Sequence, residues 1–220
     1  MVNLWVVLLE IIVTVVVPLL VLYHKSGWPL RHRTTSLILV PLLWYVVYAP
    51  IHELSHLLAA YLVGGTVADV RLIPPFWRGE VAGAWISPVG ITEGPRLALM
   101  SSAPYVLDLV SSAIGLLILK RPYVRGAFLA GFAFMVLCLR PLFDLVCESI
   151  SFLSGFHGDL YHIGIHAGTA TMATLVLASL TMATSAAILV PARLRPEAAQ
   201  VTKDAYGGPG GLMEGVGKRE

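Results

Sequence analysis

The residues His52-Glu53-Leu54-Ser55-His56 have the types and the spacing of a metal site. On a helix, positions i and i+4 lie on one face, so two imidazoles can bind one zinc ion. Zinc lowers the pKa of a bound water towards about 7, and the intervening glutamate can then accept the proton of that water. The pattern therefore predicts that His52 and His56 bind one catalytic zinc ion and that Glu53 is the general base.

The composition of the chain indicates the surroundings of this motif. Of the 220 residues, 57% are hydrophobic and only 13% are charged, and the mean hydropathy is +0.79. Soluble domains carry about 25% charged residues, so we expect an integral membrane protein in contact with the lipid bilayer. A formal net charge of +2 forms no basic stripe, which excludes a nucleic acid as partner. Ionisable groups inside a membrane helix cost about 2.5–3.5 kcal/mol each, which disfavours a motif that serves only as internal hydrogen bonding.

The apolar runs predict the elements that must position the motif. A transmembrane helix needs about 20 apolar residues, and runs of this kind predict an all-α polytopic membrane protein with about five spans. The second run is too long for one upright helix, so it must tilt, kink or divide, and Pro50 is the predicted place. The expected spans of this single membrane-embedded domain, residues 1–192, are 4–23, 36–63, 97–119, 126–153 and 165–192.

Two segments are predicted to lie outside the membrane helices. Residues 66–95 contain short apolar runs bounded by Pro and Gly, which predict a small β-strand pair inserted after the second span. Residues 193–220 are polar and rich in glycine, which predicts a disordered tail.

The loop charges predict the orientation of this multi-pass protein. With five spans, one side of the membrane receives Lys25, Arg31 and Arg33, then Lys120, Arg121 and Arg125, and then the tail. The positive-inside rule makes that side cytoplasmic, so the tail is cytoplasmic, His52 and His56 lie in the outer half of the second span, and we expect the cell membrane as location.

Residues 52–65, with the sequence HELSHLLAAYLVGG, resemble the catalytic helix of the site-2 protease family. These are intramembrane zinc metalloproteases that cut transmembrane or juxtamembrane segments of their substrates. The resemblance implies zinc binding by His52 and His56, catalysis by Glu53, and a third ligand from an aspartate of a later membrane segment. The chain has Ser55 where the family usually has glycine, and its only asparagine, Asn3, leaves the family's membrane asparagine without a counterpart.

Two aspartates are candidates for the third ligand. Asp159 lies in a stretch that resembles the family's Gly-and-Asp segment, whereas Asp144 follows Pro141, which also resembles the family pattern. Arg140 lies one helical turn before Asp144 and gives it an ion-pair partner, so we expect Asp159 as the ligand, with Asp144 as the alternative. Asp108, nearer the middle of the membrane, ranks third.

His162 and His166 form a second i, i+4 pair on the helical face of Asp159. They are candidates for orienting the site or contacting substrate, and the alternative is a purely structural pair of hydrogen-bonded groups.

The expected function is the hydrolysis of peptide bonds in or near transmembrane segments of membrane-protein or peptide substrates. Two alternatives remain open. One is a catalytically inactive scaffold of the same fold, and the other is a transmembrane metal carrier that uses the paired histidines and Glu10.

Overall fold

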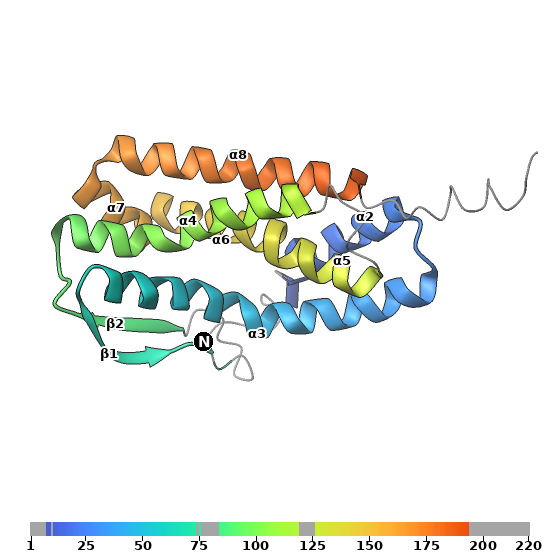
Figure 1. Ribbon diagram of the computed structural model, residues 1–220, viewed down its shortest axis with the longest axis horizontal. Coiled ribbons are helices and arrows are strands. Elements are labelled where there is room, and N and C mark those ends of the chain that lie inside the picture. Colours follow the sequence, from blue (N-terminus) through green and yellow to red (C-terminus); the bar gives the residue numbers. More distant parts are fainter. Residues whose placement is uncertain (1–7, 10, 74, 76–83, 119–125, 194–220) are drawn as a thin grey trace, which may run out of the picture.

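The computed structural model describes residues 8–9, 11–73, 75, 84–118 and 126–193. Its long helices lie side by side in an elongated bundle (Figure 1). Helix α4 (Gly94–Ile118) packs against both α3 (Leu30–Leu62) and α8 (Thr169–Arg193). Helix α6 (Arg140–Leu153) contacts α4 and α8, and a small hairpin of strands lies along α3. The bundle is thus held by contacts between α4 and its neighbours on several sides.

Within the described residues, four helices are long and apolar enough to cross a membrane: Leu30–Leu62, Gly94–Ile118, Ala127–Leu153 and Thr169–Pro191. They indicate a helical membrane protein, as the composition predicts. The first predicted span, residues 4–23, corresponds in its described part to a shorter apolar helix, Ile12–Ser26, which includes the π-helix η1 (Ile12–Val16) and α2 (Val17–Ser26). Residues 1–7 and 10 lie outside the described residues, as does the predicted tail beyond residue 193, so the count of five spans and the tail stay predictions.

Helix α3 carries the HExxH motif and continues through two prolines. It runs for 33 residues and includes Pro41 and Pro50, so of the three predicted alternatives a division of the run at Pro50 is wrong. A proline removes one backbone hydrogen bond, and membrane helices tolerate that loss where neighbouring helices cover it. At about 1.5 Å per residue the helix is about 50 Å long, which exceeds the hydrocarbon thickness of about 30 Å and requires tilt or projection beyond it.

The predicted fourth span is one helical segment with a widened turn in its middle. Helix α5 (Ala127–Phe134) passes into the π-helix η3 (Met135–Leu139), and α6 follows directly. Pro141 has no N–H to donate within this span, and a π turn next to a proline is a common way to rearrange the hydrogen-bond ladder.

The predicted fifth span starts later than expected. Residues 165–167 belong to a separate short helix, α7 (Asp159–Ala167), and the spanning helix α8 starts at Thr169. Between them Gly168 has φ 92°, a left-handed conformation that interrupts the helix. Asp159 opens this short connecting helix, which precedes the spanning helix.

The strand pair predicted after α3 is confirmed. Strand β1 (Thr66–Arg71) pairs antiparallel with β2 (Trp85–Val89), with Thr66 opposite Val89 and Arg71 opposite Trp85. The base of the hairpin packs against the bundle through a cluster of Ala60, Ile91, Leu97 and Met100. Residues 76–83, which include part of the apolar run expected to form the second strand, lie outside the described residues.

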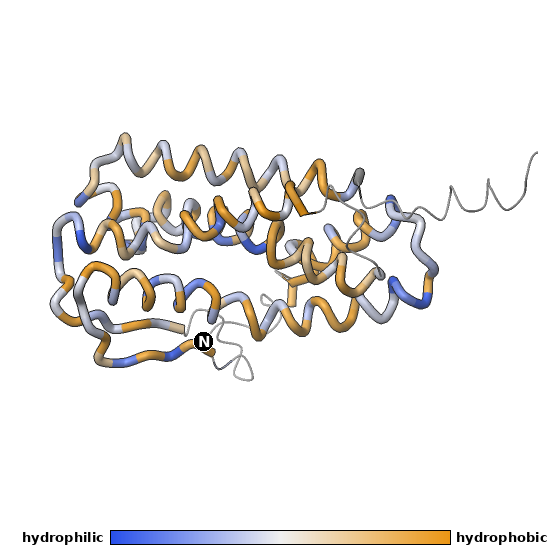
Figure 2. Tube along the Cα trace, viewed as in Figure 1, coloured by the Kyte–Doolittle hydropathy of each residue, from blue (hydrophilic) through white to orange (hydrophobic). Residues whose placement is uncertain are grey.

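The remaining core lies in two clusters, one at each end of the bundle. The larger joins α2, α3 and α5 and includes Tyr23, Val40 and Phe134, and the smaller joins α4, α6 and α7 and includes Tyr105 and Leu160. Large apolar side chains also cover the outside of the long helices, and hydrophobic residues predominate along them in Figure 2. Apolar surface of this kind fits contact with lipid.

Candidate metal site

Three side chains from two helices converge on one point. His52 and His56 come from successive turns of α3, and Asp159 comes from the first turn of α7. The two Nε2 atoms are 3.1 Å apart, and Oδ2 of Asp159 lies 3.0 Å from His56 Nε2 and 3.5 Å from His52 Nε2. The folding of α7 against α4 thus brings together residues that are more than a hundred positions apart in the sequence.

The opposite ring nitrogens determine which atoms of the histidines face this point. His56 Nδ1 lies 2.9 Å from the Met100 carbonyl, which can only accept a hydrogen bond, so Nδ1 carries the proton. His52 Nδ1 lies 3.1 Å from Oδ2 of Asp144 and has a carboxylate as acceptor. In the neutral rings both Nε2 atoms therefore present lone pairs towards the Asp159 carboxylate, and a bound cation would relieve the repulsion among the three.

The size of this triangle fits zinc. Bond lengths of about 2.0–2.2 Å and tetrahedral angles place neighbouring ligand atoms about 3.3 Å apart. The three edges of 3.0, 3.1 and 3.5 Å surround that value. Two imidazoles and one carboxylate also form a donor set that leaves a fourth position for water or substrate, as catalytic zinc sites require. Among the described residues, His52, His56 and Asp159 are the group able to hold a metal ion.

Asp159 is prepared for this role by its surroundings. Burial raises the pKa of its carboxyl, but when the two rings are protonated, the charge of His56 and the hydrogen bonds donated by His52 and His56 outweigh burial and hold the pKa below its usual value. The group is therefore a carboxylate, the form in which aspartate binds metals. Its place in the first turn of α7 adds the favourable end of the helix dipole.

The structure places Asp144 on the other side of the His52 ring. Its Oδ2 faces His52 Nδ1, while Asp159 faces Nε2 of the same ring. The predicted ion pair between Asp144 and Arg140 is confirmed, with 3.3 Å between Arg140 Nη1 and Asp144 Oδ2. The geometry therefore makes Asp159 a candidate ligand and Asp144 a hydrogen-bond partner of one ligand.

Glu53 is half-buried beside the two histidines. It follows His52 directly on α3 and interacts electrostatically with both His52 and His56. Ser55, the residue at which the chain differs from the site-2 protease pattern, donates a hydrogen bond to the His52 carbonyl at 2.6 Å. The serine is thus accommodated on the helix without displacing either histidine.

The second histidine pair contacts other residues. His166 accepts a hydrogen bond at Nδ1 from the backbone N–H of Gly94, the first residue of α4, over 3.1 Å. The ring of His162 stacks on that of His166, with 6.2 Å between centroids. The hydrogen bond of His166 connects α7 with α4, and the stacking lies within α7. Both contacts favour the structural alternative for the pair, while a role in orienting the site stays a prediction.

Two further glutamates, Glu10 and Glu148, occur in apolar segments of the sequence. Glu10 lies outside the described residues. Glu148 on α6 packs against Gly158, the residue before Asp159, where an added Cβ would lie 2.9 Å from its Oε2. This contact places a further carboxylate beside the segment that carries Asp159.

Sequence reasoning missed three groups that support the histidines. Tyr48 donates a hydrogen bond to Oδ1 of Asp144 at 2.8 Å, and its position four residues before His52 was a usable signal. Asp108 forms an ion pair with Arg140, with 2.6 Å between Oδ1 and Nη2. Predicting this pair would have required knowledge of how the two helices pack. The Met100 carbonyl is a backbone group, and no residue type could have indicated it.

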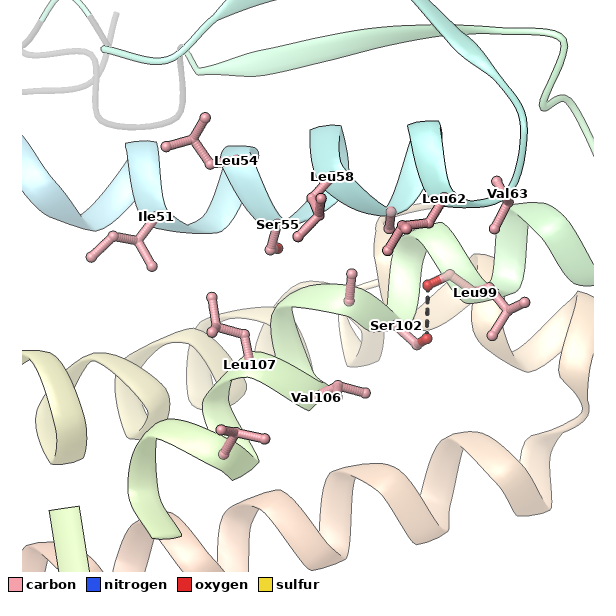
Figure 3. Close-up of a pocket in the computed structure, with 13 residues that line it drawn as sticks. Ile51, Leu54, Ser55, Leu58, Leu62, Val63, Leu99, Ser102, Val106 and Leu107 are labelled. Carbon is pink, nitrogen blue, oxygen red and sulfur yellow. Dashed lines mark hydrogen bonds between the residues drawn. The ribbon is translucent and has the colours of Figure 1, made fainter. Parts of the chain in front are cut away.

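A long apolar groove runs between α3 and α4 (Figure 3). Its volume is about 810 Å³, and Ile51 and Ser55, the neighbours of the histidines on α3, line one wall. Leu99, Val106 and Leu107 of α4 line the other wall. The groove therefore reaches α3 at the level of the HExxH motif.

Comparison of the chain with family models, with curated proteins and with solved structures gives no match.

Proposed function

We propose that this protein is a zinc-dependent intramembrane endopeptidase of the site-2 protease type, which hydrolyses peptide bonds in or near transmembrane segments of other proteins. The observation that carries the proposal is the triangle of His52 Nε2, His56 Nε2 and Asp159 Oδ2, with edges that match tetrahedral zinc. Glu53, in the position that the HExxH motif assigns to the general base, follows the first of these ligands directly.

The residues divide the reaction among them. His52, His56 and Asp159 hold the metal, which when bound supplies Lewis acidity for the scissile carbonyl and for water. Glu53 accepts the proton of the attacking water and delivers it to the departing amine, so one carboxyl serves first as base and then as acid. Asp144 and the Met100 carbonyl keep the two imidazoles in the tautomer that directs Nε2 to the metal.

The apolar groove between α3 and α4 supports a membrane segment as substrate. Its walls are hydrophobic, and it adjoins Ile51 and Ser55 in the same helical turns as the metal ligands. An apolar segment loses little on leaving lipid for such a surface, whereas a polar soluble peptide would lose its hydration.

The proposal is tested with the full chain in proteoliposomes that contain zinc and a mixture of synthetic single-span peptides. Cleavage products are identified by mass spectrometry, and zinc per chain is measured by elemental analysis. We expect one zinc ion per wild-type chain. In Glu53→Gln, cleavage falls by about 100- to 10,000-fold, because the general base is lost, while zinc stays bound.

Glu93→Gln is the matched control, because Glu93 is exposed in the turn before α4 and the same charge is removed there. We expect it to cleave as the wild type does. Full activity in Glu53→Gln would contradict the assignment of the base, and a wild-type chain without zinc would contradict the metal site. Stoichiometric zinc without cleavage of any peptide would favour the inactive scaffold, and zinc flux into the vesicles would favour the carrier.

A further inference from the structure

We propose that Asp108 and Tyr48 are positioning residues for the metal ligand His52, because they keep the carboxylate of Asp144 directed at its imidazole, Asp108 by limiting the pull of Arg140 on that carboxylate. This inference rests on the metal site of the proposed function. Neither belongs to the group that could hold the metal, and each acts through a neighbour.

The contacts form a continuous chain from α4 to the metal site. Asp108 Oδ1 lies 2.6 Å from Nη2 of Arg140, and Nη1 of the same guanidinium lies 3.3 Å from Oδ2 of Asp144. That oxygen is also 3.1 Å from His52 Nδ1, while Tyr48 donates to the second oxygen, Oδ1, at 2.8 Å. Asp108, Arg140 and Asp144 are each at most 2% exposed, so bulk solvent does not reach these three side chains.

One oxygen atom, Oδ2 of Asp144, is shared by two cationic or donor groups. Arg140 and His52 both face it, so a stronger pull from Arg140 weakens the hydrogen bond to the imidazole. Asp108 limits that pull, because it holds the other arm of the guanidinium at the shorter distance. The single positive charge of Arg140 is shared between the carboxylates of Asp108 and Asp144, so the negative charge of Asp144 is only partly neutralised and can still attract His52. Such charge interactions are strong in a low-dielectric interior.

The backbone of the fourth span helps to place Arg140 and Asp144. The π-helix η3 ends at Leu139, and the N–H of Arg140 bonds to the Met135 carbonyl, five residues earlier. The wider turn shifts the following residues around the helix axis, and Arg140 and Asp144 both lie in the interior. Single π turns of this kind are frequent at functional sites, because they redirect side chains.

A purely structural role predicts a different outcome from a positioning role. If the ion pairs only join α4 to α6, their loss lowers the unfolding temperature of the metal-free protein and leaves the zinc affinity of the folded fraction unchanged. If Asp108 limits the pull of Arg140, zinc affinity falls in folded protein that lacks Asp108 alone, because Arg140 then draws Asp144 away from His52 and the ring no longer directs Nε2 to the metal.

The experiment measures the zinc Kd of the purified full chain in detergent by competition with a chromogenic chelator, together with the unfolding temperature without metal. In Asp108→Asn the guanidinium is released onto Asp144, and we expect zinc to bind about tenfold more weakly. In the double variant Asp108→Asn, Arg140→Gln the competing charge is also gone, and we expect recovery to within about threefold of wild type.

Two results would overturn the proposal. One is an unchanged Kd in folded Asp108→Asn, and the other is an equal loss in the single and the double variant, since the loss would then not depend on the charge of Arg140. If Asp108→Asn does not fold, Tyr48→Phe decides, because it removes only one hydroxyl.

We expect about threefold to tenfold weaker zinc binding in Tyr48→Phe, as one hydrogen bond to a carboxylate is lost. Tyr61→Phe on the same helix is the control, because Tyr61 is exposed, and it should bind zinc as the wild type does. An unchanged Kd in Tyr48→Phe overturns the proposal. Because zinc binding is measured and not cleavage, a wild type that binds zinc but cuts nothing would contradict the proposed function and leave this inference standing.

Discussion

The imidazole of His52 lies between two aspartates that approach it from opposite sides. Asp159 faces Nε2 together with His56, whereas Asp144 faces Nδ1. A metal ion at Nε2 can reach Asp159, but the ring itself separates it from Asp144. The two carboxylates that local sequence arguments could not fully separate therefore have different geometric relations to the same ligand.

Replacing each aspartate with asparagine distinguishes a metal ligand, Asp159, from a hydrogen-bond partner of a ligand, Asp144. Asp144→Asn removes a charged partner of a ligand, and we expect zinc to bind about 10–100-fold more weakly with one ion still bound at saturation. Asp159→Asn removes a ligand, and we expect a larger loss than in Asp144→Asn together with loss of cleavage. Equilibrium dialysis with zinc at fixed pH measures both. A larger loss in Asp144→Asn than in Asp159→Asn would reverse the assignment.

Contacts in the site could be predicted from the sequence where the two residues lie within one helical turn of each other. The i, i+4 histidines indicated a shared face of one helix, and the i, i+4 pair of Arg140 and Asp144 indicated an ion pair, which is confirmed. Asp108 was not predicted as the partner of Arg140, because the contact joins two helices. Such pairings depend on helix packing, and one sequence contains no direct signal for them.

At the scale of the element, the end of the motif helix determines where the hairpin starts. Gly64 has φ 77°, and the N–H of Gly65 bonds to the Ala60 carbonyl at 2.9 Å, which together form a Schellman motif. The side chain of Arg96 adds a further cap through its bond to the Val63 carbonyl at 2.8 Å. Strand β1 begins two residues after Gly64, so this turn fixes the hairpin next to α3.

Gly64→Ala is therefore expected to destabilise the protein, by about 1–2 kcal/mol, because an alanine in the left-handed region meets its own carbonyl. A Cβ at this position would also approach Nη2 of Arg96 to 2.9 Å, but that atom ends a flexible side chain and can move. Gly64→Asn is the matched comparison, since asparagine tolerates this conformation better. Thermal unfolding in detergent should rank glycine above asparagine and asparagine above alanine. Equal stability of the asparagine and alanine variants would contradict backbone strain as the cause.

Prolines and glycines in the sequence did not predict the helix boundaries equally well. Pro50 was predicted as a possible break, yet α3 continues through it. A proline removes only one backbone hydrogen bond, and neighbouring helices in a membrane protein can compensate for that loss. Gly168 was not predicted as a break, yet its positive φ separates α7 from α8. Hydropathy located the apolar segments, but it does not report the backbone conformation of a single glycine.

At the scale of the whole molecule, the two ends of the bundle differ. One end carries the turn between α2 and α3, and the other carries the hairpin, α7 and the turn before α4 (Figure 1). The turn between α2 and α3 is hydrophilic in Figure 2, and two exposed cations flank it, Lys25 near the end of α2 and Arg31 near the start of α3. Of the three candidate metal ligands, His52 and His56 lie in the C-terminal half of α3, towards the hairpin end, and Asp159 opens α7 at the same end. The loop charges predict that the α2–α3 end is cytoplasmic.

Single cysteines at the two ends test this orientation. The native thiols are removed by Cys138→Ala and Cys147→Ala, and a cysteine is placed at one of two exposed positions, His32→Cys beside the α2–α3 turn or Glu93→Cys before α4. Because short basic loops stay on the cytoplasmic side, a membrane-impermeant maleimide added to intact cells should label Glu93→Cys and leave His32→Cys unlabelled. Permeabilised cells provide the control, in which both cysteines should react.

The reverse pattern would place the metal ligands in the cytoplasmic half of the membrane. Labelling of both positions from outside would contradict the separation of the two ends by a membrane, since α3 and its neighbours would then not span one.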